Sequence, residues 1–291
     1  MLDVKEYHRP HELADALRLL QRQDVRTVPL AGGTGLVGRG GPGVEAVVDL
    51  HELGLDYITV APPEAEATGG PFPLRVGAMT SLQTLVESET VDDLAGGLLG
   101  EAACRSASAT LRAQSTVGGT LAAGDARHPL AVALLALDAE LMVWVGTERR
   151  HVPLDSFLGY RAQLVGQRAL IVEVRVPRSD AVTGGGFADV ARTPADMPIV
   201  CAAARIYRDT AGGRAFGARL ALGGVAERPL RMPAAERVIE GQVVTPELFA
   251  RVETLVREAV HPAGDWLGGA DYRREMAGVL ARRAVLEAWG D

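Results

Sequence analysis

Two glycine-rich segments of this chain have the composition needed to bind phosphate groups. The first reads Leu30-Ala31-Gly32-Gly33-Thr34-Gly35-Leu36-Val37, and the second reads Ser115-Thr116-Val117-Gly118-Gly119-Thr120. Because glycine has no Cβ, successive backbone N–H groups in such segments can turn toward an anion. Each segment alone is also typical of an ordinary tight turn. As a pair, and with no P-loop lysine in either, they predict a diphosphate held from two sides, as in a dinucleotide.

Three side chains in or after these segments carry oxygen atoms that could contact the dinucleotide. The hydroxyls of Thr34 and Thr116 either contact the diphosphate or satisfy the backbone of their own turns. The carboxylate of Asp125 either accepts hydrogen bonds from sugar hydroxyls or caps the helix expected to begin near Pro129. The sequence leaves both alternatives open at each position.

The composition restricts the classes of protein to which the chain can belong. Its 291 residues suffice for two domains, and a net charge of −7 with scattered arginines disfavours nucleic-acid binding. No apolar run is long enough to span a bilayer, and the N-terminal residues lack the pattern of a signal peptide, so we expect a cytoplasmic protein. Two cysteines are too few for an iron–sulfur cluster, and the histidines form no helical metal pair, so no metal site is predicted.

Hydrophobic periodicity and turn residues divide the chain into strands and helices. The expected strands are 4–7, 27–30, 46–50, 57–60, 74–78, 140–145, 150–153, 169–177, 186–192, 199–207 and 215–223, and the expected helices are 10–21, 81–88, 91–104, 129–137, 233–240, 246–259 and 270–289. A polar, glycine-rich stretch at 179–186 suggests a boundary. It separates a domain of residues 1–178, with subdomains of about 1–54 and 55–178, from an α+β domain of residues 179–291 with a three-stranded sheet and helices.

Six short motifs follow one another in the order found in one protein family. They are Tyr7-His8-Arg9-Pro10, Ala31-Gly32-Gly33-Thr34, Val48-Asp49-Leu50, the segment 111–119, Glu173-Val174-Arg175-Val176-Pro177 and Leu220-Ala221-Leu222-Gly223-Gly224-Val225. Over nearly the whole chain they resemble the FAD-binding medium subunit of the molybdenum hydroxylases, the group of carbon monoxide dehydrogenase and xanthine dehydrogenase. The resemblance implies the α+β FAD-binding fold of the vanillyl-alcohol oxidase and p-cresol methylhydroxylase type, with two subdomains around FAD and a C-terminal flavoprotein domain.

The resemblance also implies a function. The chain would be an electron-transfer oxidoreductase subunit that takes electrons from an iron–sulfur small subunit, beside a molybdopterin large subunit, and passes them to NAD, a quinone or oxygen. The residues implied to bind FAD are Leu30, Ala31, Gly32, Gly33, Thr34, Gly35, Leu36, Val37, Thr116, Val117, Gly118, Gly119, Thr120, Asp125 and Val172. Val172 either supports the flavin ring through its backbone or belongs to the core. Arg192 and Asp196 either form an ion pair or lie near the ring.

Three positions depart from the pattern of that family. Thr120 stands where the family usually has asparagine, Pro129 lies at about the position of its flavin-side aspartate, and Ala188 replaces a basic residue. Asp125 either supplies the carboxylate from a shifted position, or the contact is absent. Two alternatives to the electron-transfer subunit therefore stay open: a stand-alone flavin oxidase or dehydrogenase of the same fold, and a scaffold subunit that has lost FAD.

Overall fold

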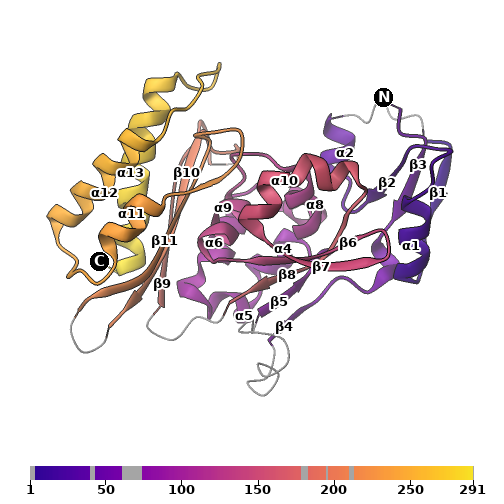
Figure 1. The fold of residues 1–291 in the computed structure, drawn as a ribbon, viewed down its shortest axis with the longest axis horizontal. Coiled ribbons are helices and arrows are strands. Elements are labelled where there is room, and N and C mark those ends of the chain that lie inside the picture. Colours follow the sequence, from indigo (N-terminus) through magenta and orange to yellow (C-terminus); the bar gives the residue numbers. More distant parts are fainter. Residues whose placement is uncertain are drawn as a thin grey trace. The chain divides into compact units, whose positions relative to one another are not determined.

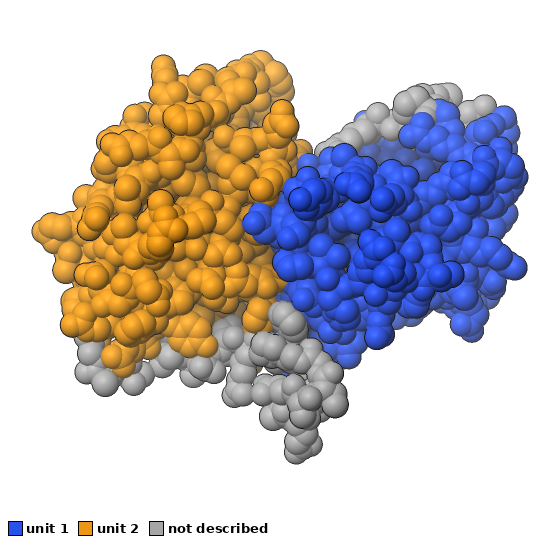
Figure 2. Space-filling model, viewed as in Figure 1, with its two compact units in different colours: residues 1–84, 109–124, 140–176 blue, residues 85–108, 125–139, 177–291 orange. Residues whose placement is uncertain are grey.

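The computed structural model describes residues 4–39, 43–60, 74–177, 183–194, 196–209 and 213–290. The chain forms two compact units, coloured blue and orange in Figure 2. Unit 1 consists of Met1–Thr84, Ala109–Gly124 and Glu140–Val176, and unit 2 consists of Leu85–Ser108, Asp125–Ala139 and Pro177–Asp291. The chain thus passes back and forth between the units. Within the described ranges, no helix is long and apolar enough to cross a membrane.

Unit 1 begins with a small parallel sheet in the order β1-β3-β2 (Figure 1). Its strands are β1 (Glu6–His8), β2 (Thr27–Leu30) and β3 (Ala46–Asp49), and helix α1 (Leu13–Leu20) packs beside it through its buried apolar face. Arg168 caps the C-terminal end of α1 by donating to the carbonyls of Leu20 and Arg22. Because the strands are parallel, their carboxyl ends meet at one edge, and β2 leads from that edge into the first glycine-rich segment.

The second sheet of unit 1 has five antiparallel strands in the order β4-β5-β8-β6-β7. They are β4 (Ile58–Val60), β5 (Leu74–Gly77), β6 (Glu140–Val145), β7 (Glu148–Pro153) and β8 (Leu170–Val176). The other helical elements of the unit are the short helices α2 (Thr34–Arg39), η1 (His51–Leu53), α7 (Ala109–Gln114) and α8 (Val117–Ala123) and the longer α10 (Leu154–Gly166), and α4 (Leu82–Val86) spans the boundary of the unit. A buried cluster that includes Leu17, Leu50 and Val172 joins the two sheets.

A buried carboxylate fixes β5 against β8. The side chain of Glu173 is 1 % exposed, and it accepts hydrogen bonds from Tyr57 at 2.6 Å, from Arg75 Nε at 2.8 Å and from Arg175 Nε at 2.6 Å. Burial alone would raise the pKa of this carboxyl, but these donors outweigh burial and hold its pKa below the ordinary value. β5 leads directly into the residues that hold the start of α8, so Glu173 stabilises the frame of that helix.

Unit 2 contains an antiparallel sheet in the order β12-β11-β10-β9. Its strands are β9 (Thr183–Val190), β10 (Val200–Arg208), β11 (Ala215–Gly223) and β12 (Leu230–Arg231). The predicted three-stranded sheet is therefore wrong by one strand, because two residues at 230–231 pair with β11 and are too few to give a sequence signal. The further helical elements of unit 2 are α5 (Glu89–Asp92), η3 (Ala95–Gly97), α6 (Leu98–Cys104), α9 (Pro129–Ala136), α11 (Pro233–Ile239), α12 (Pro246–Ala259) and α13 (Ala270–Trp289).

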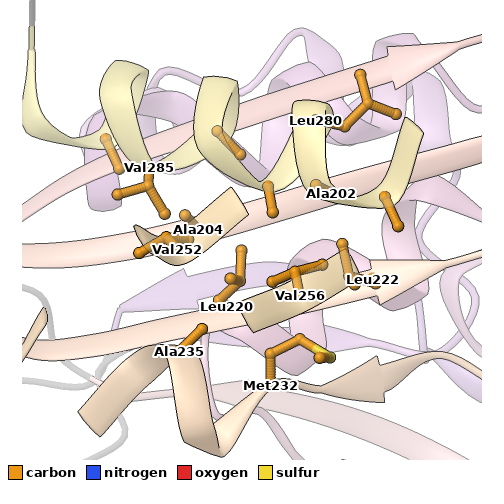
Figure 3. Packing of buried hydrophobic residues seen from close by; sticks show 14 of the residues in the cluster. Ala202, Ala204, Leu220, Leu222, Met232, Ala235, Val252, Val256, Leu280 and Val285 are labelled. Atoms are coloured by element: carbon orange, nitrogen blue, oxygen red, sulfur yellow. The ribbon is translucent and has the colours of Figure 1, made fainter. Parts of the chain in front are cut away.

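The core of unit 2 lies between the sheet and its C-terminal helices. Alternate residues of β10 and β11, among them Ala202, Ala204, Leu220 and Leu222, pack with residues of α11, α12 and α13 (Figure 3). Helix α9 contacts β10 and β11, and all eight of its residues are buried. It lies toward the other face, where Val132 of α9 lies 2.8 Å from the place where a Cβ of Gly223 would be.

Several predicted elements differ from the structure. The predicted helix 91–104 is broken into α5, η3 and α6, because Ala95, Gly96 and Gly97 have positive φ angles. Four helices were not predicted: α7 and α10 carry no continuous apolar stripe, and α2 and α8 lie in the glycine-rich segments, which were expected to be loops. The described part of the predicted linker, 183–186, lies inside β9. Its glycines serve close packing: a Cβ on Gly186 would lie 2.2 Å from the carbonyl oxygen of Ala284 in α13.

Replacing Glu173 with glutamine is expected to lower the free energy of unfolding at neutral pH by about 3 kcal/mol, the scale for breaking a buried ion pair. A carboxyl whose folded-state pKa is lowered stabilises the fold above its unfolded-state pKa, and that contribution is lost as the pH falls toward the folded-state value. The wild-type chain should therefore lose stability below about pH 4.5 more steeply than the variant. Thermal unfolding at a series of pH values measures both effects.

The matched control is Glu148→Gln, on strand β7 at the edge of the same sheet, because that side chain is 63 % exposed and pairs with Arg150 at the surface. Its effect should stay within about 0.5 kcal/mol. Equal stabilities and equal pH profiles for the two variants would show that the Glu173 network does not hold the sheet together.

Candidate cofactor-binding site

The structure brings the two glycine-rich segments together within unit 1. Thr34 Oγ1 and Ser115 Oγ lie 3.1 Å apart and share a hydrogen bond. A Cβ on Gly32 would lie 1.5 Å from the carbonyl oxygen of Gln114, so the first segment passes directly over the backbone at the end of α7. A Cβ on Gly119 would lie 3.6 Å from the Cβ of Ala31. The two segments therefore form one surface.

The second segment is the first turn of α8, not an open loop. All four of its leading N–H groups donate to acceptors of unit 1: Val117 to Thr80 O at 3.0 Å, Gly118 to Ala78 O at 2.8 Å, Gly119 to Thr116 Oγ1 at 3.1 Å and Thr120 to Thr116 O at 2.9 Å. The hydroxyl of Thr116 is thus the N-cap of the helix, which corresponds to the second of its two predicted alternatives. These N–H groups are already engaged, so the expected phosphate nest of Gly118 and Gly119 has no support here.

Close packing explains the glycines of this second segment. A Cβ on Gly118 would lie 2.7 Å from the Cβ of Ala78, and one on Gly119 would lie 2.9 Å from Thr116 Oγ1. Thr120, at the position where the resembling family has asparagine, is buried. The start of α8 is therefore held firmly against the residues that follow β5.

The first segment differs, because the first turn of a helix leaves its N–H groups without intrahelical acceptors. Helix α2 begins at Thr34, directly after Gly33, whose φ of +73° favours glycine. Within the described residues, no acceptor is present for the N–H groups of Gly33, Thr34 and Gly35. Residues 31–36 are half-buried, and Val37 is exposed. The surface formed by the two segments therefore offers several N–H donors from one side, the side of α2.

The remaining predicted residues have other environments. Leu30 ends β2 and its carbonyl accepts from Leu50 N at 3.0 Å, while Leu36 lies in α2. Val172 is buried in the cluster that joins the two sheets, and its carbonyl accepts from Ala78 N at 3.0 Å. Its environment is thus that of a core residue.

Asp125 belongs to unit 2, where it shapes the turn before α9. Its Oδ1 accepts from Arg127 N at 2.9 Å and lies 3.5 Å from Arg127 Nε. Burial acts to raise the pKa of this carboxyl, but the Arg127 N–H and guanidinium outweigh burial and lower it. The N-cap position of α9 is His128, with no capping hydrogen bond from its side chain, so the expectation that Asp125 caps this helix is wrong. Asp125 forms an Asx turn one step earlier.

Three further expectations concern residues of unit 2. Within its described residues, Arg192 and Asp196 form no ion pair; the Arg192 guanidinium lies 5.8 Å from the centre of the Trp266 ring. Pro129, the second departure from the family pattern, is the buried first residue of α9, a position that suits proline. Ala188, the third, packs against the core of unit 2. No cluster of side chains that could hold a metal ion is found among the described residues.

Sequence reasoning missed the residues that organise the site from outside the glycine-rich segments. Ala78 and Thr80 accept from α8, and Gln114 supports Gly32. These contacts use backbone atoms, which leave no residue-type signal. Ser115 lies inside the second segment, and as a hydroxyl residue directly before Thr116 it could have been noted as a partner for Thr34.

Comparisons with known proteins agree with one another. Residues 2–179 match the family model "FAD binding domain in molybdopterin dehydrogenase", and residues 186–288 match "CO dehydrogenase flavoprotein C-terminal domain". The carbon monoxide dehydrogenase medium chain of Afipia carboxidovorans is 29 % identical over 290 residues, covering 97 % of this chain and 96 % of the relative. The xanthine dehydrogenase FAD-binding subunit of Escherichia coli O157:H7 is 25 % identical over 295 residues, covering 99 % and 97 %.

A solved structure shows the same fold. It is a carbon monoxide dehydrogenase from Hydrogenophaga pseudoflava that lacks the Mo-pyranopterin moiety of its cofactor. One of its chains is 30 % identical to this one, with a TM-score of 0.87, and the alignment covers 98 % of this chain and 97 % of the other. The predicted fold class is confirmed in its FAD-binding and C-terminal flavoprotein domains.

Proposed function

This chain belongs to the family of FAD-binding medium subunits of the molybdenum hydroxylases, and on that premise we propose that it carries electrons from a partner iron–sulfur subunit to an external acceptor. The chain is an oxidoreductase subunit and its cofactor is FAD, as the resemblance of its sequence motifs predicted. Several relatives are medium chains, a name that implies larger and smaller companion chains. The partners we propose are a small subunit with iron–sulfur clusters and a large subunit with molybdopterin.

The observation that carries the proposal is a difference between the two glycine-rich segments. The N–H groups of the second segment already have acceptors, whereas those of Gly33, Thr34 and Gly35 have none among the described residues. The FAD diphosphate would lie against the first turn of α2, where Gly33, Thr34 and Gly35 offer donors, because phosphates bind where unpaired N–H groups converge. Residues 116–120 would not contact the diphosphate through their N–H groups. They would hold α8 and Ser115 in place beside the first turn of α2. Contacts of FAD with Asp125 and Val172 remain proposals.

FAD supplies the redox chemistry when bound, and the protein supplies its position and surroundings. The residues of this chain therefore need no acid–base pair of their own. They bind a dianionic diphosphate with neutral backbone donors, which keeps the cofactor in place without adding a competing titratable group beside it. The substrate of the complex would be chosen by the molybdopterin subunit, and the acceptor that we propose is NAD, a quinone or oxygen.

The division of the chain that we propose places the boundary after residue 178. It is supported by the two family models, of which one ends at residue 179 and the other begins at residue 186. We also propose a cytoplasmic location, since a chain of this size with two cysteines has no disulfide framework.

Replacing Gly35 with valine is expected to lower the affinity for FAD at least about tenfold, the effect of losing one or two hydrogen bonds to a charged group. The Cβ itself would fit, at 3.6 Å from Ala123 Cβ, but the two methyl groups beyond it would take up space at the first turn of α2, where the diphosphate would bind. The measurement is a titration of apo-protein with FAD, followed by the flavin fluorescence.

Gly38→Val is the matched control, because it makes the same change in the same helix at a position with no other atom within 4 Å of its Cβ. Both variants lose the same helix propensity, so both apo-proteins should unfold at similar temperatures. Equal FAD affinities for the two variants would mean that the diphosphate does not bind at the start of α2.

Electron transfer is tested by anaerobic mixing of the FAD-loaded chain with its iron–sulfur subunit, reduced with dithionite and freed from the excess. We expect the visible absorbance of the oxidised flavin to be lost on mixing, because the partner's electrons reduce it. A chain that cannot be loaded with FAD would be a scaffold. A chain whose flavin is reduced by a small organic donor alone would be a stand-alone oxidase. A flavin that remains oxidised with the reduced partner would contradict the proposal.

A further inference from the structure

An exposed tryptophan of unit 2 stands at the tip of a tightly closed turn just before α13. Asp265 N donates to Gly268 O at 3.0 Å, and Gly268 N donates to Asp265 O at 3.2 Å. The carboxylate of Asp265 also accepts from Leu267 N at 2.8 Å. Trp266 lies between these closed ends, and 80 % of its surface is exposed. Burying a tryptophan is strongly favourable, so the exposure of so large an apolar ring is costly to the isolated chain.

A buried arginine braces this turn. Arg273 of α13 is 3 % exposed and donates to Asp265 Oδ1 at 2.7 Å and to Gly268 O at 3.2 Å. On its other side it donates to Ile199 O at 2.8 Å and Gly224 O at 2.9 Å. Because a guanidinium can be buried only when its donors are satisfied, these bonds tie the turn firmly to the ends of β10 and β11. The backbone that presents Trp266 is therefore rigid.

The exposed ring has a positively charged neighbour and an aromatic neighbour. The guanidinium of Arg192, which follows β9, lies 5.8 Å from the centre of the Trp266 ring. Among the described residues, none of the carboxylates pairs with Arg192. Tyr272, also exposed, lies against the turn, with its Cδ1 3.1 Å from the position of a Cβ on Gly268. Trp266, Arg192 and Tyr272 together are called the aromatic knob below.

We propose that the aromatic knob is a docking surface for another subunit of the complex, in which Trp266 enters an apolar pocket whose rim carries a carboxylate for Arg192. This inference rests on the proposed function, since it requires partner subunits. A small molecule is disfavoured as the occupant, because small-molecule sites are concave and Trp266 projects from a turn. A braced aromatic side chain loses little conformational entropy on binding, which is the property of binding hot spots.

The charge of Arg192 argues for an acidic partner group. In the part of the chain that the structure describes, this guanidinium faces the Trp266 ring and pairs with no carboxylate. A partner that buried the ring without a carboxylate would have to desolvate an unpaired cation, which is costly. The chain carries a net charge of −7, so a positive feature beside an exposed aromatic ring can select its partner by charge as well as by shape.

The experiment uses the complex formed by coexpression of this chain with its iron–sulfur and molybdopterin subunits. Trp266→Ala should raise the dissociation constant for this chain at least about thirtyfold, as expected for a hot spot. Arg192→Gln should weaken assembly less, and Arg192→Lys should restore part of the loss. The dissociation constant is obtained by diluting the purified complex and measuring the fraction of free chain. Tyr160→Ala is the control, because Tyr160 is 65 % exposed on α10 of unit 1 and should have no effect.

Three readouts separate the possible outcomes. FAD content and the unfolding temperature of the isolated chain should be the same for Trp266→Ala and Tyr160→Ala. Assembly of Trp266→Ala as tight as that of the wild type would overturn the docking surface and leave the proposed function intact. The docking surface would also be overturned if the isolated wild-type chain formed a dimer and Trp266→Ala were a monomer. A wild-type chain that binds FAD but no partner subunit would overturn the proposed function itself.

Discussion

The close approach of Gly32 to the carbonyl of Gln114 is the contact on which the site depends. A side chain at Gly32 would overlap that carbonyl oxygen, so only glycine lets the end of β2 pass over the end of α7. The approach places Thr34 within hydrogen-bond distance of Ser115 and aligns the start of α2 with the start of α8. Two stretches of chain far apart in the sequence thus become one surface, without a metal-binding cluster or disulfide among the described residues.

The two glycine-rich segments that form this surface differ in their hydrogen bonding, although their sequences are alike. α8 is fixed, because the carbonyls of Ala78 and Thr80 and the Thr116 hydroxyl accept its leading N–H groups. At the start of α2, the corresponding N–H groups have no acceptor among the described residues. In the arrangement that we propose, one glycine-rich segment would be the support and the other would bind the diphosphate. The Glu173 network holds β5, and through it the support, in position.

Much of this arrangement could be predicted from the sequence, and the rest could not for physical reasons. The strand before Leu30 and the Gly-Gly pairs are local signals, so the segments and their pairing were found. The N–H groups of Val117 and Gly118 donate to backbone carbonyls of residues that follow β5, and such acceptors have no residue-type signature. The same holds for Arg273, whose four acceptors include three backbone carbonyls, and for the two-residue strand β12. The helix cap considered for Asp125 was wrong, because its carboxylate accepts from the backbone of Arg127 before α9 begins.

The most direct test of the central claim is amide hydrogen exchange, resolved residue by residue, on the apo-protein with and without FAD. The N–H groups of Gly33, Thr34 and Gly35 should exchange fast in the apo-protein and slow strongly when FAD binds. Those of Val117, Gly118 and Gly119 should already be protected and change little. Protection gained only at Val117–Gly119, with no change at Gly33–Gly35, would contradict the account, because the diphosphate would then bind at α8 and not at α2.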